Sequence, residues 1–462
     1  MIRVLRTTDP RFTALRRRLA RRGEIMDAGV EPVVREILGD VRRRGDRALA
    51  AATLRFDRVR VAQRDLVVGR EPMRDACREL PAADLRALRL AAARIRSFHL
   101  RQRERSFRYR DPLGVVLGQE IRPLERVGLY VPGGSAFYPS SVLMNAIPAR
   151  VAGVDEVIAV SPPHAGGESP ALLAACWVAG VDRLVRVGGA QAIGALAFGT
   201  RSVPRVDKIV GPGNAWVATA KRLVSGSVGI DMIAGPSEVL VVADAQADPS
   251  LVAADLLAQA EHDAQASALC LTPSASLAAA LQRAVEEQLA TLPRAAIACR
   301  SIRDHGFVIV TRNLDEAVEL ANEIAPEHLE LAVRDAARLV PRIRHAGAIF
   351  LGHSTPEAFG DYLAGPNHVL PTGGTARFSS PLGVYDFVKR TSIIEAPPRA
   401  LARLAPPLLR LAAMEGLSAH AAAVARRVEG GPAAAARVRV GRGRRAVAKV
   451  PPRPRAPRKR AG

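Results

Sequence analysis

The sequence predicts an α/β fold with two Rossmann-like parallel-sheet domains, and three observations lead to this prediction. The first is a series of short apolar runs near residue 126 and beyond, each closed by Gly or Pro and followed by a helical segment: RVGLYVPGG, EVIAVSPP, RLVRVGGAQ and DKIVGPGN. Strands that alternate with helices in this way indicate βαβ units and a parallel sheet. The second is a similar series further along the chain: SEVLVVADA, ALCLTP, GFVIVTR, HLELAV and GAIFLG. The third is composition, because 462 residues with 48% hydrophobic and 24% charged side chains suffice for more than one domain with its own core.

The segments before and after the two sheets have a helical pattern. Residues 1–25 read as a short basic arm, and residues 27–108 carry apolar positions at helical spacing. The pattern from residue 382 on is again helical, as in PRALARLAPPLLRLAAMEGLSAH. We therefore expect a helical N-terminal arm and a helical C-terminal segment around the two sheets.

The net charge of +22 is concentrated at the C-terminus. No acidic residue follows Glu429, whereas 11 Lys or Arg residues lie between Arg437 and Arg460. The basic tail 431–462 is rich in Arg, Pro, Gly and Ala and has little to bury, so we expect it to be disordered. Its role stays open between a solvated extension and a non-specific contact with nucleic acid.

Cysteine usage and the N-terminus bear on the compartment. The cysteines are far apart, without a CxxC pair, at Cys77, Cys176, Cys270 and Cys299. This pattern favours reduced thiols and a cytoplasmic protein. The first residues, MIRVLRTTDPRFTALRRRLARRGE, lack the apolar region of a secretory signal, and no apolar run reaches the roughly 18 residues of a membrane span.

Three polar or aromatic residues lie beside glycines at the expected carboxyl ends of strands in the first sheet. They are Tyr130 before VPGG, Gln191 in VGGAQAIG and Asn214 in GPGN. Ligands of open parallel sheets bind at this edge, and glycines there let the backbone approach a phosphate. The spacing alone leaves two readings open, a nucleotide site or ordinary loop glycines, because no GxGxxG with a following acidic residue is present.

Candidate metal ligands occur in three separate stretches. Gln259 and His262 in LLAQAEHDAQ are spaced to share one face of a helix. Further candidates are Asp361 and His368 in FGDYLAGPNH and His420 in EGLSAH. His, Asp and amide oxygens can hold zinc or a similar ion, but a lone helical His that is simply hydrogen-bonded is the alternative.

Glu327 and His328 in NEIAPEHLEL place an acid beside a base. Pro326 ends the amphipathic helix before them, and an alternating strand-like run follows. Adjacent side chains of a regular strand face opposite ways, so both reach one site only if the joint is irregular. The alternative is a solvated turn with an incidental pair.

Ten stretches of the chain together resemble the histidinol dehydrogenases. They run in the family's order from about residue 25 to 428: VGLYVPGGSAFYPSSVLMNAIPA, RVGGAQAIGALAFGT, DKIVGPGNAWV, IDMIAGPSEVLV, DLLAQAEHD, ANEIAPEHLEL, HAGAIFLG, GDYLAGPNHVLPT, SPLGVYDFVKR and EGLSAH. The resemblance implies oxidation of L-histidinol to L-histidine through L-histidinaldehyde, with two NAD reduced and one zinc per active site. It also implies a homodimer in which the partner chain completes each site.

The resemblance assigns roles to individual residues. Glu327 and His328 are the implied catalytic pair, with Glu327 activating water and His328 removing substrate protons. The implied NAD contacts are Tyr130, Gln191 and Asn214. The implied zinc ligands are Gln259, His262, Asp361 and, from the neighbouring subunit, His420. The implied substrate contacts are Ser237, Gln259, His262, Glu327, His328, Asp361, His368, Glu415 and His420.

These assignments lead to a domain prediction. We expect an N-terminal arm in 1–25, a zinc and substrate domain from 26–129 and 238–381, and an NAD-binding domain in 130–237. A helical dimerisation domain in 382–430 and the basic tail 431–462 would follow.

Other functions stay open at this point. A related zinc- and NAD-dependent dehydrogenase of another small polar alcohol, such as a sulfonated diol, is the nearest alternative. A nucleic-acid-binding protein on a silent scaffold is disfavoured, because every expected catalytic position is filled. The stretch KRLVSGSVGID, residues 221–231, is shorter than the family pattern, and the basic tail is not a family feature.

Overall fold

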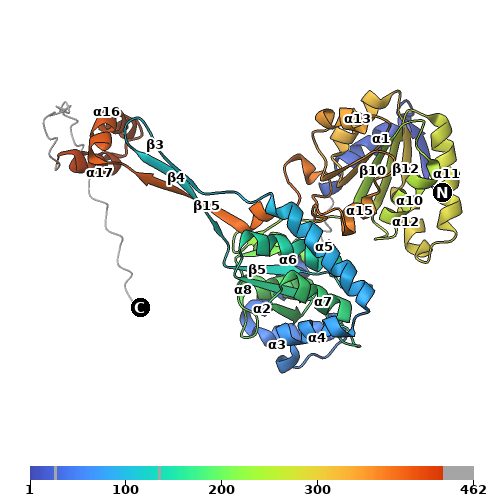
Figure 1. Ribbon diagram of the computed structural model, residues 1–462, viewed down its shortest axis with the longest axis horizontal. Coiled ribbons are helices and arrows are strands. Elements are labelled where there is room, and N and C mark those ends of the chain that lie inside the picture. The colour runs from blue at the N-terminus through green and yellow to red at the C-terminus, as the bar shows by residue number, and fades with distance from the viewer. Residues whose placement is uncertain (25–28, 134–136, 430–462) are drawn as a thin grey trace, which may run out of the picture. The chain divides into compact units, whose positions relative to one another are not determined.

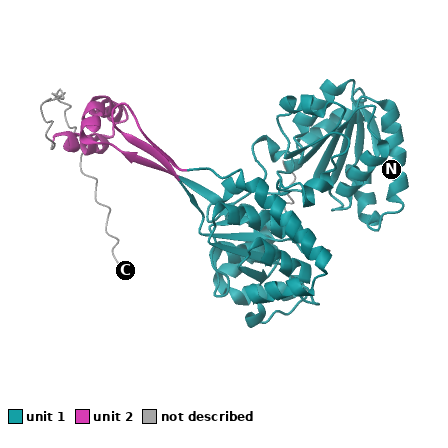
Figure 2. Ribbon diagram, in the orientation of Figure 1, with its two compact units in different colours: residues 1–105, 121–390 teal, residues 106–120, 391–462 magenta. Residues whose placement is uncertain are grey.

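The computed structural model describes residues 1–24, 29–133 and 137–429 (Figure 1). The chain forms two compact units (Figure 2). Unit 1 comprises residues 1–105 and 121–390, and unit 2 comprises residues 106–120 and the chain from Thr391 on. Unit 1 contains two six-stranded sheets, which confirms the predicted α/β fold with two parallel-sheet domains. The basic tail 431–462, predicted to be disordered, lies outside the described residues.

The first sheet has the strand order β2-β7-β6-β5-β8-β9. Its strands are β2 (Val67–Val68), β5 (Arg126–Tyr130), β6 (Glu156–Ser161), β7 (Arg183–Arg186), β8 (Lys208–Val210) and β9 (Gly229–Ile230). All of them pair in parallel except β2, which is antiparallel to β7. The chain proceeds from β5 to β6 and β7 on one side, then returns to β8 and β9 on the other. The strand order therefore reverses between β5 and β8, and ligands of open sheets bind beside such a reversal.

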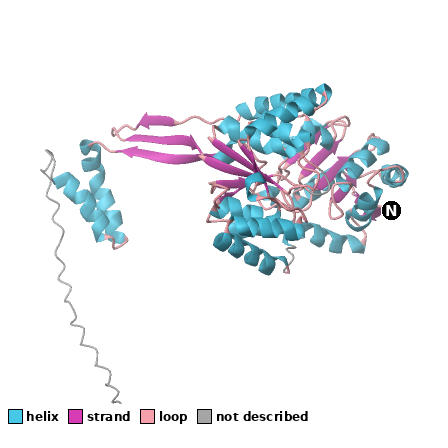
Figure 3. Cartoon of the chain, turned by 90° about the horizontal axis from the view of Figure 1, so that it is seen from below, coloured by secondary structure: helices cyan, strands magenta, loops and turns pink. Residues whose placement is uncertain are grey.

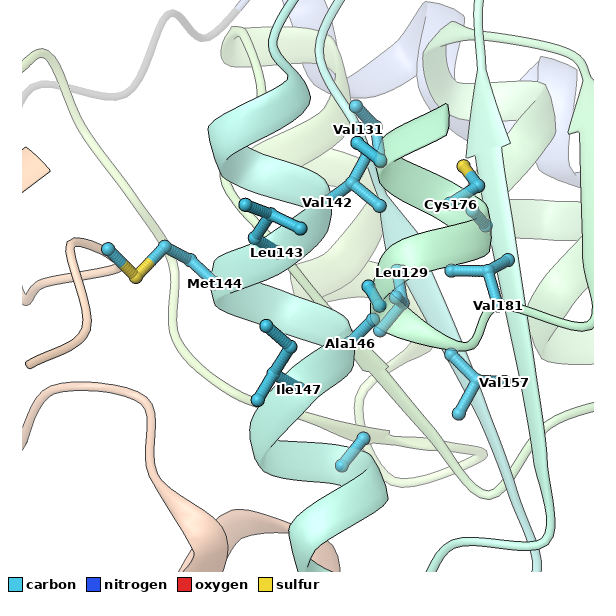
Figure 4. Packing of buried hydrophobic residues seen from close by; sticks show 14 of the residues in the cluster. Leu129, Val131, Val142, Leu143, Met144, Ala146, Ile147, Val157, Cys176 and Val181 are labelled. Carbon is cyan, nitrogen blue, oxygen red and sulfur yellow. The ribbon is translucent and has the colours of Figure 1, made fainter. Parts of the chain in front are cut away.

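Helices cover both faces of the first sheet. One apolar cluster joins this sheet to α4 (Arg70–Glu79), α5 (Ala82–Leu100), α6 (Pro139–Ala152) and α7 (Pro170–Ala179). The opposite cluster joins it to α2 (Val30–Arg44), α3 (Asp46–Phe56), α8 (Gly189–Phe198) and α9 (Ala215–Val224). In Figure 4, Leu143 and Ile147 of α6 belong to the first cluster together with Leu129 and Val157 of the sheet. Apolar burial on both faces is what makes the strands of this sheet nearly continuous apolar runs.

The second sheet has the order β1-β12-β11-β10-β13-β14, with parallel pairing throughout. Its strands are β1 (Arg3–Arg6), β10 (Glu238–Ala243), β11 (Ser267–Thr272), β12 (Phe307–Val310), β13 (His328–Ala332) and β14 (Ala348–Leu351). One face is covered by α10 (Pro249–Ala260), α11 (Ala275–Leu289) and α12 (Ala295–His305), and the other by α1 (Pro10–Ala20) and α13 (Leu314–Ile324). Two shorter helices, α14 (Ala336–Leu339) and α15 (Glu357–Tyr362), complete this part of unit 1. Single 3-10 turns also occur: η1 (Arg22–Glu24), η2 (Gln63–Asp65), η3 (Val340–Arg342), η4 (Thr375–Arg377) and η5 (Val384–Phe387).

The structure corrects the predicted placement of the N-terminal segments. Residues 26–129 were expected to join the sheet of residues 238–381, but α2 to α5 pack on the first sheet, and β2 extends it. Conversely, the arm 1–25 supplies β1 and α1 to the second sheet. The apolar face of an amphipathic helix indicates that the helix packs on a core, but it does not indicate which of the two sheets provides that core.

A third sheet is present where the sequence predicted no strand, and two of its three strands continue from unit 1 into unit 2. The strands β3 (Phe107–Arg110), β4 (Val116–Pro123) and β15 (Val388–Glu395) form a sheet in the order β15-β4-β3, visible as long arrows in Figure 3. The helical prediction was wrong for the start of β3 and for β15, because their Arg and other polar residues hide any apolar alternation. No element was predicted for β4. The expected C-terminal helices are present as α16 (Pro398–Met414) and α17 (Ser418–Glu429). No described helix is both long and apolar enough to cross a membrane.

Candidate active site

Tyr130 is the last residue of β5 and marks the carboxyl edge of the first sheet. Its side chain is buried, and its hydroxyl oxygen accepts a hydrogen bond from the backbone N–H of Gly189 at 3.1 Å. Burial raises the pKa of Tyr130 to about 12, so the hydroxyl keeps its proton and can donate it to a ligand. Tyr130 therefore links the end of β5 to the start of α8.

Gln191 lies at the same joint, in the first turn of α8. Its buried side chain lies over Gly189, because a Cβ on that glycine would be 2.8 Å from Gln191 Oε1. Gly189 also has φ +62°, a conformation that favours glycine. The structure thus brings Tyr130 and Gln191 together at one glycine.

Asn214 begins α9, and its Oδ1 accepts hydrogen bonds from the backbone N–H groups of Trp216 at 3.1 Å and Val217 at 3.2 Å. The loop before it runs against β5: a Cβ on Gly211, which has φ +105°, would lie 2.3 Å from the carbonyl oxygen of Tyr130. Only glycine allows this approach. The contact of Gly211 with β5 therefore holds the loop that leads to Asn214 beside the end of β5.

A buried ion pair holds the loop between β8 and α9. Lys221 Nζ donates to the carbonyl oxygen of Gly211 at 2.9 Å and pairs with Asp231 Oδ1. Asp231 Oδ2 accepts a hydrogen bond from the N–H of Gly211 at 2.8 Å. The Lys221 and Asp231 side chains are 2% and 1% exposed, so this pair fixes both backbone groups of Gly211 away from solvent.

The carboxyl edge of the first sheet suits an anionic ligand. The helices α8 and α9 both begin there, and the first N–H groups of a helix have no partner within it. A helix N-terminus also carries a partial positive charge, which attracts phosphate. This edge lies at the reversal of strand order, where dinucleotides bind in folds of this class.

Glu327 and His328 lie at the opposite kind of edge, the amino end of β13 in the second sheet. The preceding helix α13 ends at Ile324, and Ala325 takes φ +50°. Pro326 then prevents a return to helix. The backbone between α13 and β13 is therefore irregular. Such irregularity is what allows the adjacent side chains of Glu327 and His328 to face the same site.

Both side chains are anchored by the backbone of Glu238, the first residue of β10. The N–H of Glu238 donates to Glu327 Oε2 at 2.8 Å, and its carbonyl oxygen accepts a hydrogen bond from His328 Nδ1 at 3.0 Å. Glu327 Oε2 and His328 Nδ1 are 3.8 Å apart. One backbone unit of the neighbouring strand thus holds the acid and the base side by side.

The His328 ring is set up to accept a proton. Because Nδ1 donates to a carbonyl, the neutral ring has its lone pair on Nε2. Among the described residues Nε2 is buried without a hydrogen-bond partner, and Asp361 Oδ1 lies 3.9 Å from it. Burial is the main cause that lowers the pKa of His328. The ring is therefore in the state that a general base requires.

Glu327 is buried as deeply as its neighbour, since both residues are 5% exposed. This burial excludes the alternative of a solvated turn. Burial also raises the pKa of Glu327 well above its usual range, although the hydrogen bond from Glu238 opposes that shift. A carboxylate with a raised pKa is a stronger base toward water.

A cluster of possible metal ligands lies within the same part of unit 1. Ligand atoms of His262, Glu357 and Asp361 lie within 4.8 Å of one another. His262 follows the C-terminal end of α10, and the two carboxylates lie one turn apart on α15. Imidazole nitrogen and carboxylate oxygen are suitable ligands for zinc. The structure thus brings together His262 and Asp361 of the predicted ligand set, and adds Glu357.

Gln259 and His368 contact this cluster through hydrogen bonds. Gln259 is fully buried, and in the amide orientation that satisfies its nitrogen, Nε2 donates to Glu357 Oε1 and to the carbonyl oxygen of Glu238, both at 3.2 Å. His368 Nδ1 donates to the carbonyl oxygen of Asp361 at 3.1 Å, and burial lowers the pKa of His368. Both predicted residues therefore lie at the site.

Buried carboxyl groups extend behind the cluster. Burial raises the pKa of Glu357 well above its usual range, the pKa of Glu330 to about 9 and the pKa of Asp255 to about 6. The N–H of Glu357 donates to Glu330 Oε1 at 2.7 Å. A divalent cation would favour the charged forms of nearby carboxylates and so lower these pKa values. The donor set and its surplus of buried carboxyl groups fit a bound cation.

The remaining predicted residues lie beside the anchor or in unit 2. Ser237 directly precedes Glu238, and its carbonyl oxygen accepts a hydrogen bond from the N–H of Ser267 at 3.0 Å. Glu415 directly follows α16, and His420 lies in α17, both in unit 2. The structure of one chain therefore groups the predicted residues of unit 1 and leaves these two on a separate unit.

A family model described as histidinol dehydrogenase matches residues 20–428. The chain belongs to the histidinol dehydrogenase family. A histidinol dehydrogenase from Syntrophotalea carbinolica is 56% identical over 429 residues, which is 93% of this chain and 100% of that protein. One from Pseudomonas fluorescens strain Pf-5 is 53% identical over 421 residues, or 91% of this chain and 95% of that protein. The crystal structure of histidinol dehydrogenase from Elizabethkingia anophelis superposes with a TM-score of 0.87 at 35% identity, covering 93% of this chain and 98% of that one.

Sequence reasoning did not single out two residues of this histidinol dehydrogenase site. Glu357 carries a signal that was available, because it lies four positions before Asp361 and thus on the same helix face. Glu238 carries none, since it acts through its backbone and its role depends on the register of β10 against β13.

Proposed function

We propose that this chain is a zinc-dependent histidinol dehydrogenase. It oxidises L-histidinol to L-histidine through L-histidinaldehyde with reduction of two NAD, as the last steps of histidine biosynthesis. The observation that carries the proposal is the pair Glu327 and His328 on one backbone unit, with the free lone pair of His328 near Asp361 of the ligand cluster. Membership of the histidinol dehydrogenase family supports L-histidinol as the substrate.

Gln259, His262, Asp361 and the partner subunit's His420 would hold the zinc. When bound, zinc would orient the substrate through its imidazole and amino nitrogens, and NAD would accept a hydride in each step. Tyr130, Gln191 and Asn214 would bind the dinucleotide at the carboxyl edge of the first sheet. Glu357 would hold the amide of Gln259 so that its oxygen faces the metal.

His328 acts in both oxidations. It takes the hydroxyl proton of histidinol as hydride leaves the carbinol carbon, which gives the aldehyde. Glu327 then removes a proton from water as the water oxygen adds to the aldehyde carbon. His328 returns its proton to the resulting oxyanion, which gives the hydrate and leaves the ring neutral again. His328 takes a hydroxyl proton of the hydrate as the second hydride leaves, which gives the carboxylic acid. The buried location of both groups keeps bulk water from the reactive aldehyde.

Unit 2 would pair with a second copy of the chain. Leu411 and Met414 of α16 are 60% and 77% exposed, and large apolar side chains at such exposure suit an interface. Ser237, His368 and the partner subunit's Glu415 and His420 would then complete the substrate site. We place the enzyme in the cytoplasm, because all its cysteines are free thiols and none is paired. No membrane or specific nucleic-acid partner is part of the proposal.

The activity is tested with purified protein, zinc, NAD and L-histidinol, with a sulfonated diol in a parallel reaction. We expect two NADH per histidinol consumed, with histidine as the product. Oxidation of the diol without oxidation of histidinol would instead establish the related dehydrogenase. Absence of NADH from both alcohols would contradict the proposal.

The shared site is tested by mixing two inactive variants. His328→Ala in one chain and His420→Ala in the other leave one intact site per mixed dimer, if each site takes His420 from its partner. Refolding the two together should therefore restore part of the activity. No recovery in a verified mixed dimer would contradict a shared site.

A further inference from the structure

Arg22 lies in the N-terminal segment, in the turn η1. It nevertheless contacts Glu238, whose backbone holds Glu327 and His328. Its Nε donates to Glu238 Oε1 and its Nη2 donates to Glu238 Oε2, both at 2.6 Å. The side chains of Arg22 and Glu238 are only 11% and 7% exposed. A two-pronged contact of this kind fixes orientation as well as charge.

The same guanidinium also holds the end of the helix that leads to the acid and base. Arg22 Nη1 donates to the carbonyl oxygens of Leu19 at 2.7 Å and Ile324 at 2.8 Å, and Nη2 donates to that of Ala325 at 3.4 Å. Ile324 and Ala325 immediately precede Pro326. Arg22 thus satisfies carbonyl groups that the end of α13 leaves without helical partners.

Arg22 therefore joins the two segments whose relative position sets the site. One segment is the start of β10, where the backbone of Glu238 holds Glu327 and His328. The other segment is the end of α13, which leads directly to Glu327 and His328. The backbone N–H of Gly373 also donates to Glu238 Oε1, at 3.1 Å, so the Glu238 side chain is held from two directions.

We propose that Arg22, through Glu238, is a positioning residue for the pair Glu327 and His328. This inference rests on the proposed function. A buried ion pair adds little net stability compared with apolar residues of similar size. Its contribution here is positional, and a misplacement of about 1 Å at a reacting group can lower the rate about 100-fold.

The proposal predicts a specific kinetic pattern for Arg22→Met. The turnover number should fall by roughly 10- to 100-fold for histidinol and for the aldehyde alike, because both Glu327 and His328 depend on Glu238. The KM for NAD should stay within about twofold, because none of the proposed NAD contacts touches Arg22 or Glu238. Arg22→Lys keeps the charge but loses the two-pronged contact, so its turnover should lie between those of Arg22→Met and the wild type.

Arg16→Met is the matched control. Arg16 also makes a two-pronged contact between α1 and the C-terminal turn of α13, with Glu323, but it is 55% exposed and does not touch Glu238. Its turnover should equal that of the wild type. The double variant Arg22→Met with Glu238→Gln removes both buried charges, so it carries the test if Arg22→Met alone does not fold.

The outcomes separate the inference from the proposed function. Folded Arg22 variants, single or double, with reduced turnover in both steps and an unchanged KM for NAD support the positioning role. Turnover of the double variant equal to that of Arg16→Met would overturn it. If the wild type forms no NADH from histidinol in the same assay, the proposed function fails instead.

Discussion

The two sheets present their candidate binding residues at opposite ends of their strands. In the first sheet, Tyr130 ends β5, and the other predicted NAD contacts lie at the starts of α8 and α9, which follow β7 and β8. In the second sheet, the acid and base stand at the amino end of β13, and their anchor stands at the amino end of β10. Carboxyl ends lead into helix N-termini, whereas amino ends receive helix C-termini.

This difference matches the charge of what each edge would bind. Helix N-termini carry a partial positive charge, which favours the phosphates of a dinucleotide. Helix C-termini favour cations, and Gln259 and His262 stand at the C-terminal end of α10. Several buried carboxyl groups gather at the second edge, among them Glu327, Glu330 and Glu357, whereas the buried Asp231 of the first edge is paired with Lys221. We therefore propose that the first edge binds an anion and the second a cation, at opposite ends of parallel strands.

Each edge also rests on one buried ion pair that fixes the backbone. Lys221 and Asp231 hold Gly211 at the first edge, and Arg22 and Glu238 hold the acid and base at the second. Substitutions at the first edge should therefore change the KM for NAD, and substitutions at the second edge should change turnover or zinc affinity. Neither should change the quantities that depend on the other edge.

The largest expected effect is that of His328→Ala. Loss of the general base should lower turnover of both the alcohol and the aldehyde by about 100- to 10,000-fold, with little change in the KM for NAD. Stopped-flow measurement of NADH formation from each substrate checks this. The lowered pKa of His328 adds a pH prediction: the base is unprotonated at neutral pH, so wild-type activity should fall only on acidification. An active His328→Ala enzyme would contradict the assignment.

Glu357→Gln tests the proposed cation site of the second sheet. Loss of this carboxylate should weaken zinc binding by about 10- to 100-fold, because it contacts Gln259 and lies in the ligand cluster. Competition with a chelator measures this without reference to activity. Glu287→Gln, on the exposed side of α11, is the control and should bind zinc as the wild type does. Equal zinc affinity in both variants would remove Glu357 from the metal site.

Lys221→Met with Asp231→Leu tests the anion side. The double variant avoids an unpaired buried charge but releases Gly211, so the KM for NAD should rise by about tenfold while zinc affinity is unchanged. Arg222→Met is the control, since Arg222 is the next residue of α9 and pairs instead with Glu31 at the surface. A KM for NAD equal in the two proteins would show that the ion pair does not position the loop.

The sequence predicted the two sheets because the signal for each strand is local. Apolar runs closed by Gly or Pro recur along both halves, and the strands found there coincide with them. The charged strands β1, β3 and β15 lack that signal and were missed. Pro326 indicated the irregular joint of Glu327 and His328 correctly, because a proline constrains its own backbone whatever surrounds it.

Convergence of the site residues could be predicted only through the resemblance. Glu238 approaches Glu327 and His328 because β10 pairs in register with β13, about 90 residues later in the chain, and no local pattern encodes that pairing. The contact of Arg22 with Glu238 spans an even longer separation. Such contacts are properties of the folded sheet.

Glu327 and His328 are proposed to act in different steps, and Glu327→Gln separates these steps. Turnover should be measured separately with histidinol and with the aldehyde under single-turnover conditions. We predict that aldehyde oxidation falls by about 100-fold or more, because its water is no longer activated, while alcohol oxidation falls by less than about tenfold. An equal loss in both steps, or no loss in either, would contradict the account.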